Sequence, residues 1–378
     1  MTQTREPVRA ARRTRFGAVV VLALLLLFGV PWATLVLPWS TPVVVAGTVV
    51  FAVAVVAFPF LMFLGHGRGR DWAARVGDTM LGVVWVLFAW SVLGLVARLA
   101  QAPSRVVAVV VLAVAVVLVA WGVREAMRVP RVRRTEVTLP RLGAGLDGTT
   151  VVVLADTHYG PINRTRWSQR TAAAVNALSP DIVCHAGDIA DGTVAQRLSQ
   201  AAPLGTITAR YALGYVTGNH EYMGQAQGWL DHMASLGWEA LHNRHVVIEN
   251  DGARLVLAGI DDATARSSGL EGHGAQLEAA LAGAPADAPV LLVAHQPRQV
   301  AQTAGHVDLQ VSGHTHGGQI WPFHYLVRVD QPSVHGLSQH GTTQLYTSRG
   351  AGFWGPPLRV FAPSEITLLT LRAPGHRS

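Results

Sequence analysis

The sequence contains no lysine, so all 30 of its basic residues are arginine. This absence excludes Schiff-base catalysis, which needs a lysine amine, and it excludes a P-loop, whose motif requires lysine. Cysteine is nearly absent, because Cys184 is the only one among 378 residues. A single cysteine excludes an intrachain disulfide and a zinc site built from several cysteines. Its apolar surroundings, Ile182-Val183-Cys184, indicate a buried strand residue rather than a nucleophile.

Acidic residues are scarce in the first part of the chain. Up to Arg141 there are 16 arginines against 5 acidic residues, and beyond it 14 against 18, so the two parts carry +11 and −4 and sum to +7. The high pI therefore belongs to the N-terminal segment. The remainder is mildly acidic and has no basic stripe, so we expect no nucleic-acid partner.

Four long apolar stretches, almost free of charge, occupy the N-terminal third of the chain. They cover about 16–39, 43–64, 80–99 and 106–123. Each is close to the roughly 20 residues that cross a bilayer. So many consecutive residues without a polar face argue against buried helices of a soluble protein. We therefore predict a membrane domain over residues 1–128 with four transmembrane helices.

Arginines flank these stretches unevenly. Five precede the first stretch, three lie between the second and third, and five follow the fourth, whereas the loop at 38–42 has none and the loop with Arg98 and Arg105 has two. Because cytoplasmic loops carry the excess of positive charge, this predicts a multi-pass cell-membrane protein whose C-terminal domain is cytoplasmic. Arg12-Arg13 also occurs in twin-arginine export signals, but such a signal would not explain three further spans.

The segment 129–147, rich in arginine, proline and glycine, is predicted to be a juxtamembrane linker, either resting on anionic headgroups or simply solvated. The region 148–373 then changes to short apolar runs between polar, glycine-bearing turns. Runs typical of strands are 149–155, 181–185, 215–217, 246–248, 254–259, 290–294, 307–311, 344–347 and 366–371. Helical patterns cover 166–178, 226–236 and 277–281. This alternation predicts an α/β domain, in which ligands gather at the carboxyl ends of strands.

Five polar clusters follow five of these apolar runs. They are Asp156-Thr157-His158, Gly187-Asp188-Ile189-Ala190-Asp191, Gly218-Asn219-His220-Glu221, His295-Gln296-Pro297 and Ser312-Gly313-His314-Thr315-His316-Gly317-Gly318-Gln319. Imidazole, carboxylate and amide groups suit borderline divalent cations, and glycine lets the backbone come close to an ion. Each cluster alone is common in ordinary turns. Five of them in this order, each at a strand end, predict one metal site.

In this order and spacing, the region from Thr149 to Leu371 resembles the calcineurin-like metallophosphoesterase superfamily, with no ligand position of the family's pattern substituted. Later motifs are similar to a membrane-associated bacterial branch that includes the "transmembrane protein with metallophosphoesterase domain" type. These motifs are Gly317-Gly318-Gln319, Ser348-Arg349-Gly350, Pro357-Leu358-Arg359 and Pro363-Ser364-Glu365. The resemblance implies a β-sandwich of two mixed sheets flanked by helices, with a site for two metal ions between the sheet ends.

The resemblance also implies roles for individual residues. Asp188 would be shared between the two ions, and the full ligand sets would be Asp156, His158, Asp188 and His316 for one ion and Asp188, Asn219, His295 and His314 for the other. His220 would act as the second catalytic residue besides Asp188 by protonating the leaving group, supported by Glu221 or Asp191. The two cations, which we expect to be Mn, Fe or Zn, would neutralise the phosphoryl oxygens and lower the pKa of a bridging water for in-line attack.

The expected function is hydrolysis of phosphoester or pyrophosphate bonds by a membrane-anchored enzyme, with a lipid-linked substrate as one hypothesis. The aromatic residues after the last cluster, Trp321, Phe323, Tyr325, Phe353 and Trp354, would accept an acyl chain or pack in the core. Likewise Arg349 and Arg359 would bind phosphate or pair with carboxylates.

Two alternatives stand beside this expectation. In one, the spans form a sensor or transporter module with a regulatory phosphoesterase-fold domain. The spans contain few polar residues beyond Thr34 and Ser91, so a substrate pathway has little to be built from. In the other, the metal domain is an interaction scaffold, against which the intact ligand set argues. The sequence leaves the oligomeric state open.

Overall fold

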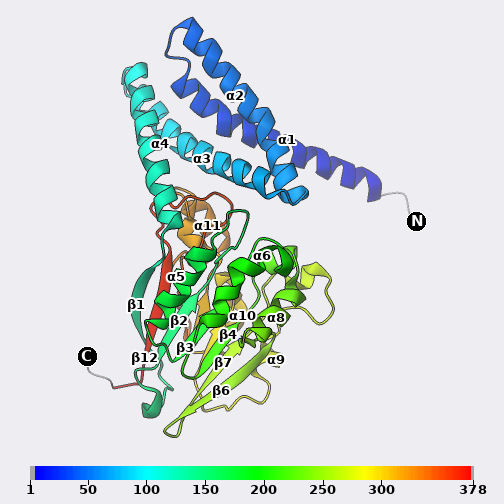
Figure 1. Cartoon of the computed structure of the whole chain (residues 1–378), viewed down its shortest axis with the longest axis vertical. Coiled ribbons are helices and arrows are strands. Elements are labelled where there is room, and N and C mark those ends of the chain that lie inside the picture. The colour runs from blue at the N-terminus through cyan, green and yellow to red at the C-terminus, as the bar shows by residue number, and fades with distance from the viewer. Residues whose placement is uncertain (1–4, 376–378) are drawn as a thin grey trace. The chain divides into compact units, whose positions relative to one another are not determined.

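The computed structural model describes residues 5–375, with side chains described from residue 17 onward. The chain divides into two compact units, one ending at Gly122 and the other beginning at Val123 (Figure 1). The first unit is entirely helical. The second contains every strand that the structure describes.

Four helices make up the first unit, of which the last continues into the second: α1 (Arg5–Leu35), α2 (Thr41–Met62), α3 (Asp71–Leu99) and α4 (Ser104–Met127). In the described part of the chain, three helices are long and apolar enough to cross a membrane: Thr41–Gly67, Asp71–Leu99 and Ser104–Met127. The first of these consists of α2 and the π-helical turn that follows it. The apolar part of α1, Val19–Leu35, is shorter. The structure thus supports three candidate spans and a shorter apolar helix, where the sequence predicted four spans.

Apolar side chains point outward from this unit as well as inward. Phe28, Phe58 and Val84 form its small core, in which the two phenyl rings lie 5.8 Å apart. Along α2, by contrast, Val50 and Val56 are exposed, and α4 exposes a similar row of valines. An apolar outer surface of this kind suits a lipid environment, because its side chains need no hydrogen bonds to water and its backbone groups are bonded within the helices. These helices therefore indicate membrane association.

The second unit is built on two six-stranded mixed sheets. One has the order β1-β12-β2-β3-β4-β5 and the other β10-β11-β9-β8-β7-β6. The strands are β1 (Arg131–Thr138), β2 (Thr150–Leu154), β3 (Ile182–His185), β4 (Ala212–Tyr215), β5 (Glu239–Ala240), β6 (Arg244–Asn250), β7 (Ala253–Gly259), β8 (Val290–Val293), β9 (Leu309–Ser312), β10 (Gly336–His340), β11 (Thr343–Thr347) and β12 (Glu365–Arg372). The expected α/β architecture with two mixed sheets is confirmed.

Helices cover the outer faces of these sheets (Figure 1). The helices of this unit are α5 (Thr165–Asn176), α6 (Val194–Ala201), α7 (Asn219–Met223), α8 (Ala226–Ser235), α9 (Leu277–Leu281), α10 (Val300–Thr303) and α11 (His324–Asp330). Val151 and Leu257, with their neighbours, fill the core between the sheets. Trp167 of α5 and Trp229 of α8 pack on the first sheet, and Ala280 of α9 packs on the second. The side chains of each central strand alternate between the two faces of its sheet, and both faces are buried, as is usual for parallel strands covered by helices.

The segment that we predicted as a linker, 129–147, contains a strand, so that prediction was wrong for residues 131–138. There β1 pairs in parallel with β12, from Arg131 opposite Glu365 to Thr138 opposite Arg372. The strand was missed because its side chains are mostly exposed arginine, threonine and glutamate, and Val137 is its only buried residue, which gives no apolar alternation. Charged side chains are a common protection for an edge strand, because they discourage further pairing.

The central strands of both sheets end at one place. β2, β3 and β4 run parallel to one another, as do β7, β8 and β9. The loops after them are joined by backbone hydrogen bonds, in which the N–H of Asp156 donates to Gly187 O and the N–H of Gly313 donates to His295 O. The two sheets meet at these ends, because the N–H of His314 donates to Asp156 and His295 Nδ1 contacts Ala186 O. Each of the five polar clusters lies there.

Candidate metal centre

All seven side chains that the sequence pointed to as ligands lie together at these strand ends. Asp156 and His158 follow β2, Asp188 follows β3, and Asn219 begins α7 after β4. From the second sheet, His295 follows β8, and His314 and His316 follow β9. Almost all of this cluster is buried. Residues 160 positions apart in the sequence thus share one small polar volume between apolar sheets.

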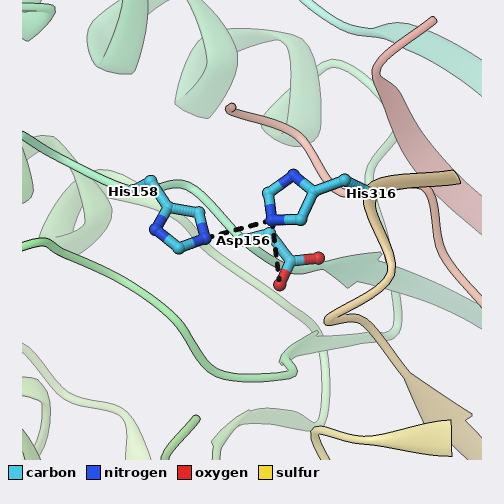
Figure 2. Close-up of side chains that lie close together, drawn as sticks. All are labelled: Asp156, His158 and His316. Carbon is cyan, nitrogen blue, oxygen red and sulfur yellow. Dashed lines mark hydrogen bonds and ion pairs between the residues drawn. The ribbon is translucent and has the colours of Figure 1, made fainter. Parts of the chain in front are cut away.

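The first group of ligand atoms belongs to Asp156, His158 and His316, which point toward one another (Figure 2). Their ligand atoms all lie within 4.8 Å of one another. His158 Nε2 is 3.1 Å from His316 Nε2, and His316 Nε2 is 4.0 Å from Asp156 Oδ1. Both oxygens of Asp156 accept from the backbone N–H of His314, at 2.9 and 3.0 Å, which fixes the orientation of the carboxylate.

The second group belongs to Asp188, His295 and His314, again with ligand atoms within 4.8 Å of one another. The amide oxygen of Asn219 joins it, because Asn219 Oδ1 lies 3.2 Å from His295 Nε2. One oxygen of Asp188 lies between the two groups. Its Oδ2 is 3.6 Å from His158 Nε2 in the first group and 3.2 Å from His295 Nε2 in the second.

The hydrogen bonds behind two of the histidines leave their inner nitrogens available to a cation. His295 Nδ1 lies 2.7 Å from Ala186 O, which can only accept, so Nδ1 carries the proton. His158 Nδ1 lies 2.9 Å from Asp191 Oδ1, which fixes the same tautomer. In each ring Nε2 then faces the centre. Metal-bound histidines usually donate their other N–H to a carbonyl or carboxylate in this way, so these residues fit a divalent metal.

Electrostatics at the centre are set by buried carboxylates facing imidazoles. Burial alone would raise the pKa of Asp188, but His295 and His220 outweigh it and hold that pKa well below its usual range. Burial would lower the pKa of His295, yet Asp188 raises it well above its usual range. Burial lowers the pKa of His314 to about 3. A proton on His295 and a cation compete for the same nitrogen, so cation binding would release a proton.

The backbone at the centre is held in unusual conformations. Asp156, His158, Asp188, His314 and His316 all have positive φ, between 41° and 71°. Such angles are uncommon for residues other than glycine and cluster at functional sites, where the surrounding structure imposes them. Glycine is required beside them. A Cβ on Gly218 would lie 2.2 Å from Asp188 Oδ1, and one on Gly313 would lie 2.7 Å from Asp156 Oδ2.

His220 and its partners adjoin the first group of ligands. One oxygen of Asp191 contacts His220 Nδ1 at 2.7 Å and His158 Nδ1 at 2.9 Å, and the His220 ring packs edge-on against that of His158. The ligand atoms of these three residues also lie within 4.8 Å of one another. Burial would lower the pKa of His220, but Asp188 and Asp191 raise it to about 9. The two carboxylates therefore favour the protonated form of His220.

Glu221 holds the loop that carries Asp188. Its buried carboxylate accepts from the backbone N–H groups of Asp188, Ile189 and Gly218, at 2.9, 2.8 and 2.6 Å. The sequence suggested supporting roles for Glu221 and Asp191 without distinguishing them. In the structure Asp191 contacts the imidazoles, whereas Glu221 accepts from backbone N–H groups of the turn after β3 and from that of Gly218.

Two buried arginines support the centre from behind, and sequence reasoning missed both of these roles. Arg359 donates to the carbonyls of His316, Gly352 and Ala362, so it positions the last ligand loop. This contradicts the expectation that Arg359 binds phosphate or pairs with a carboxylate. Arg164 donates to the carbonyls of Thr157 and His158 and stacks on Phe353, which is buried. Arg164 lies in no recognisable pattern, and the Pro357-Leu358-Arg359 motif does not reveal the backbone partners of Arg359.

The remaining aromatic residues near the centre divide between core and surface. Phe353 is core, whereas Trp354 is half exposed and its ring lies 6.0 Å from that of His220. Phe323 and Tyr325 are exposed at the start of α11. Arg349 is half-buried and lines a cavity of about 200 Å³. Gly317, the residue after His316, also lines this cavity.

Comparison with known proteins agrees with this geometry. Residues 149–318 match the family model described as calcineurin-like phosphoesterase. A "transmembrane protein with metallophosphoesterase domain" from Danio rerio is 36% identical over 335 residues, which cover 82% of this chain and 76% of that protein. The protein of the same name from Bos taurus is 36% identical over 69% of this chain and 61% of its own length.

A solved structure, a dimetal phosphatase from Danio rerio, aligns with 54% of this chain and 88% of its own at 15% identity, with a TM-score of 0.35. The family assignment rests on the sequence relatives, of which the first extends through both units of this chain.

Proposed function

The chain belongs to the calcineurin-like phosphoesterase family, and we propose that its metal-dependent hydrolysis uses two divalent cations held at one membrane-anchored centre. The observation that carries this proposal is the position of Asp188. A single carboxylate oxygen, Oδ2, approaches His158 of one ligand group and His295 of the other. A bridging carboxylate of this kind is what a pair of cations a few ångströms apart requires. Hydrolysis of p-nitrophenyl phosphate that depends on added metal tests the proposal.

One cation would be held by Asp156, His158, Asp188 and His316, and the other by Asp188, Asn219, His295 and His314. Bound there, the two cations would neutralise the phosphoryl oxygens and provide an acidic water as nucleophile. Nitrogen and oxygen ligands mixed in this way suit Mn, Fe or Zn, and the choice among these depends on geometry and supply.

His220 would supply the proton that the leaving group needs. Asp188 and Asp191 favour its protonated form, it is partly accessible, and it is held at Nδ1 by Asp191, so Nε2 remains as the donor. General acid catalysis requires such a proton within hydrogen-bond reach of the departing oxygen. Asp191 would keep the ring oriented and would stabilise the imidazolium, which would regain its proton from solvent after each transfer.

We further propose that the substrate is lipid-linked. The exposed side chains of α11 and the residue before it form an apolar patch made of Phe323, Tyr325, Leu326 and Val329. Val329 is 85% exposed, and α11 has no buried residue. Beside this α11 patch, the cavity next to His316 is lined by two arginines, Arg328 and Arg349, together with His324 and His335. Apolar and basic groups together suit a phospholipid, whose chains are apolar and whose headgroup is anionic.

Replacing Leu326 and Val329 by glutamate should therefore lower hydrolysis of a vesicle-borne phospholipid and leave hydrolysis of soluble p-nitrophenyl phosphate unchanged. Burying one valine contributes about 1.5 kcal/mol, so each substitution should cost about tenfold on vesicles. Leu198→Glu is the matched control, because Leu198 is 48% exposed on α6, outside the α11 patch. Equal activity of the double variant and the control on vesicles would refute the role of the patch.

The apolar helices would anchor this centre to the cell membrane, as four spans with the catalytic unit in the cytoplasm. The proposal is supported by the arginine-rich flanks and by the outward-facing valines of α2 and α4. A C-terminal reporter that is active only on the outer side of the membrane would contradict this orientation.

A further inference from the structure

A second group of ligand atoms lies outside the proposed catalytic centre, in three loops of the second unit. His242 follows β5, Asp261 follows β7, and His273 precedes α9. Their ligand atoms lie within 4.8 Å of one another, and none of the three residues belongs to the set already described. Asp261 Oδ1 is 2.6 Å from His242 Nδ1, and Asp261 Oδ2 is 3.9 Å from His273 Nδ1.

Neighbouring hydrogen bonds determine which nitrogen of His273 carries its proton. Gln227 donates from Nε2 to Asp231 Oδ1 at 2.7 Å, so its Oε1 is the atom that faces His273 Nε2, at 3.2 Å. An amide oxygen can only accept, which places the proton of His273 on Nε2. Nδ1 then carries a lone pair and accepts a hydrogen bond from the hydroxyl of Tyr222 at 3.0 Å. One N–H of the ring is thus donated to an oxygen, as in metal-binding histidines, and a cation at the unprotonated Nδ1 would replace the hydrogen bond from Tyr222.

Buried negative charge in these loops has no arginine to balance it. Asp261 and Asp262 are adjacent in the chain and almost fully buried. Asp262 accepts only from the neutral side chains of Thr264 and Gln296 and from a backbone N–H. Among the side chains that the structure describes, no arginine forms an ion pair with either carboxylate. Asp261 is instead balanced by the imidazoles of His242 and His273 and by the backbone N–H of Gly274, whereas Asp262 forms no ion pair among the described residues. A bound cation would lower the cost of burying these two adjacent carboxylates.

We propose that His242, Asp261 and His273 form a separate site for one divalent cation of the zinc class. Two imidazoles and one carboxylate are a frequent ligand set for zinc, and zinc bonds of about 2.0 Å in a tetrahedron place ligand atoms about 3.3 Å apart. The observed separations of 2.6 and 3.9 Å lie on either side of this value. Only small side-chain movements are needed. The His242 side chain is 32% exposed, which gives a cation access from solvent.

The proposed site would connect the glycine-rich loop around His273 to the catalytic loop. Tyr222, whose hydroxyl bonds to His273, lies in α7 two residues after His220. Gln299 donates to the backbone carbonyl of Asp261. Gln299 belongs to the short turn that begins at Gln296, directly after His295. A cation here would therefore stabilise the segments that position two parts of the catalytic centre, without itself touching the substrate.

Zinc binding by the full-length, chelator-treated protein in detergent tests the proposal. We expect His242→Gln/His273→Gln to bind one zinc ion fewer per chain than the wild type. The same difference should appear when both proteins also carry Asp188→Asn, because the proposed site does not depend on the catalytic ions. His306→Gln is the control, since His306 is exposed and belongs to no ligand group. It should bind as much zinc as the wild type.

A thermal readout keeps the proposal testable if the double variant folds poorly. A protein carrying only Asp188→Asn should still gain Tm on addition of zinc, because a ligand that binds only the folded state stabilises it. Adding the conservative His273→Gln should abolish that gain. Equal zinc counts with and without the histidine substitutions would overturn the site, as would a zinc-induced rise in Tm that survives His273→Gln.

Discussion

Asp188→Asn is expected to lose both bound metal and hydrolysis. The amide keeps the size of the side chain but removes its negative charge. It also replaces one carboxylate oxygen by an NH2 group, which donates hydrogen bonds. Neither the Oδ1 position nor the Oδ2 position has room for a donor. At Oδ1 the new NH2 would face the backbone N–H of His220, which donates to that oxygen at 2.8 Å. At Oδ2 it would point into the space between His158 and His295, where the carboxylate oxygen would be shared by the two cations.

The loss of activity should exceed the roughly 10- to 100-fold effect of removing a group that only supports a metal ligand. Metal content by plasma mass spectrometry and phosphate release are the two measurements. Asp251→Asn is the matched control, because Asp251 is exposed and its φ of 47° is one that asparagine adopts readily. An Asp188→Asn protein that is fully loaded with metal and fully active would refute the bridging role.

His220→Ala is expected to keep its metal and lose most of its turnover. General acid catalysis contributes typically about 10²- to 10⁴-fold, so kcat should fall within that range. The fall should be smaller for p-nitrophenyl phosphate than for an alkyl phosphate, because p-nitrophenolate departs with little need of a proton. His306→Ala, at an exposed position, should leave both substrates unaffected.

The pH profile separates this role from a structural one. A general acid works while it is protonated, so activity should be present below the pKa of His220 and lost as the pH rises through it. Asp188 and Asp191 raise that pKa to about 9, and nearby cations would lower it, so the alkaline limb should lie at or below pH 9. The limb should disappear in His220→Ala. Loss of metal from this variant would instead make His220 a ligand, together with His158 and Asp191.

The ligand side chains could be found from the sequence because each belongs to a local pattern. A buried strand followed by a polar turn is visible in a few residues, as at Val151 to His158, and parallel strands bring such turns to one edge. The family order then related distant clusters to one another. For that reason all seven side chains predicted as ligands lie together, and the family itself is confirmed by the relatives.

Features that depend on long-range pairing could not be predicted in this way. Strand β1 buries only Val137, and only its partner β12, more than 200 residues later, makes it a strand. Arg359 belongs to the Pro357-Leu358-Arg359 motif, but that motif does not show that its side chain reaches five backbone carbonyls. The triad of His242, Asp261 and His273 comes from three loops that carry no common spacing. In each case the signal lies in tertiary contacts rather than in neighbouring residues.

The central claim is that hydrolysis depends on divalent cations held at the meeting point of the two sheets. Its most direct test is phosphate release from p-nitrophenyl phosphate and its bis ester by chelator-treated protein, before and after addition of Mn, Fe or Zn. The account predicts no hydrolysis after chelation and recovery with at least one of these metals in the wild type but not in Asp188→Asn. Hydrolysis that withstands chelation, or none with any metal, would contradict it.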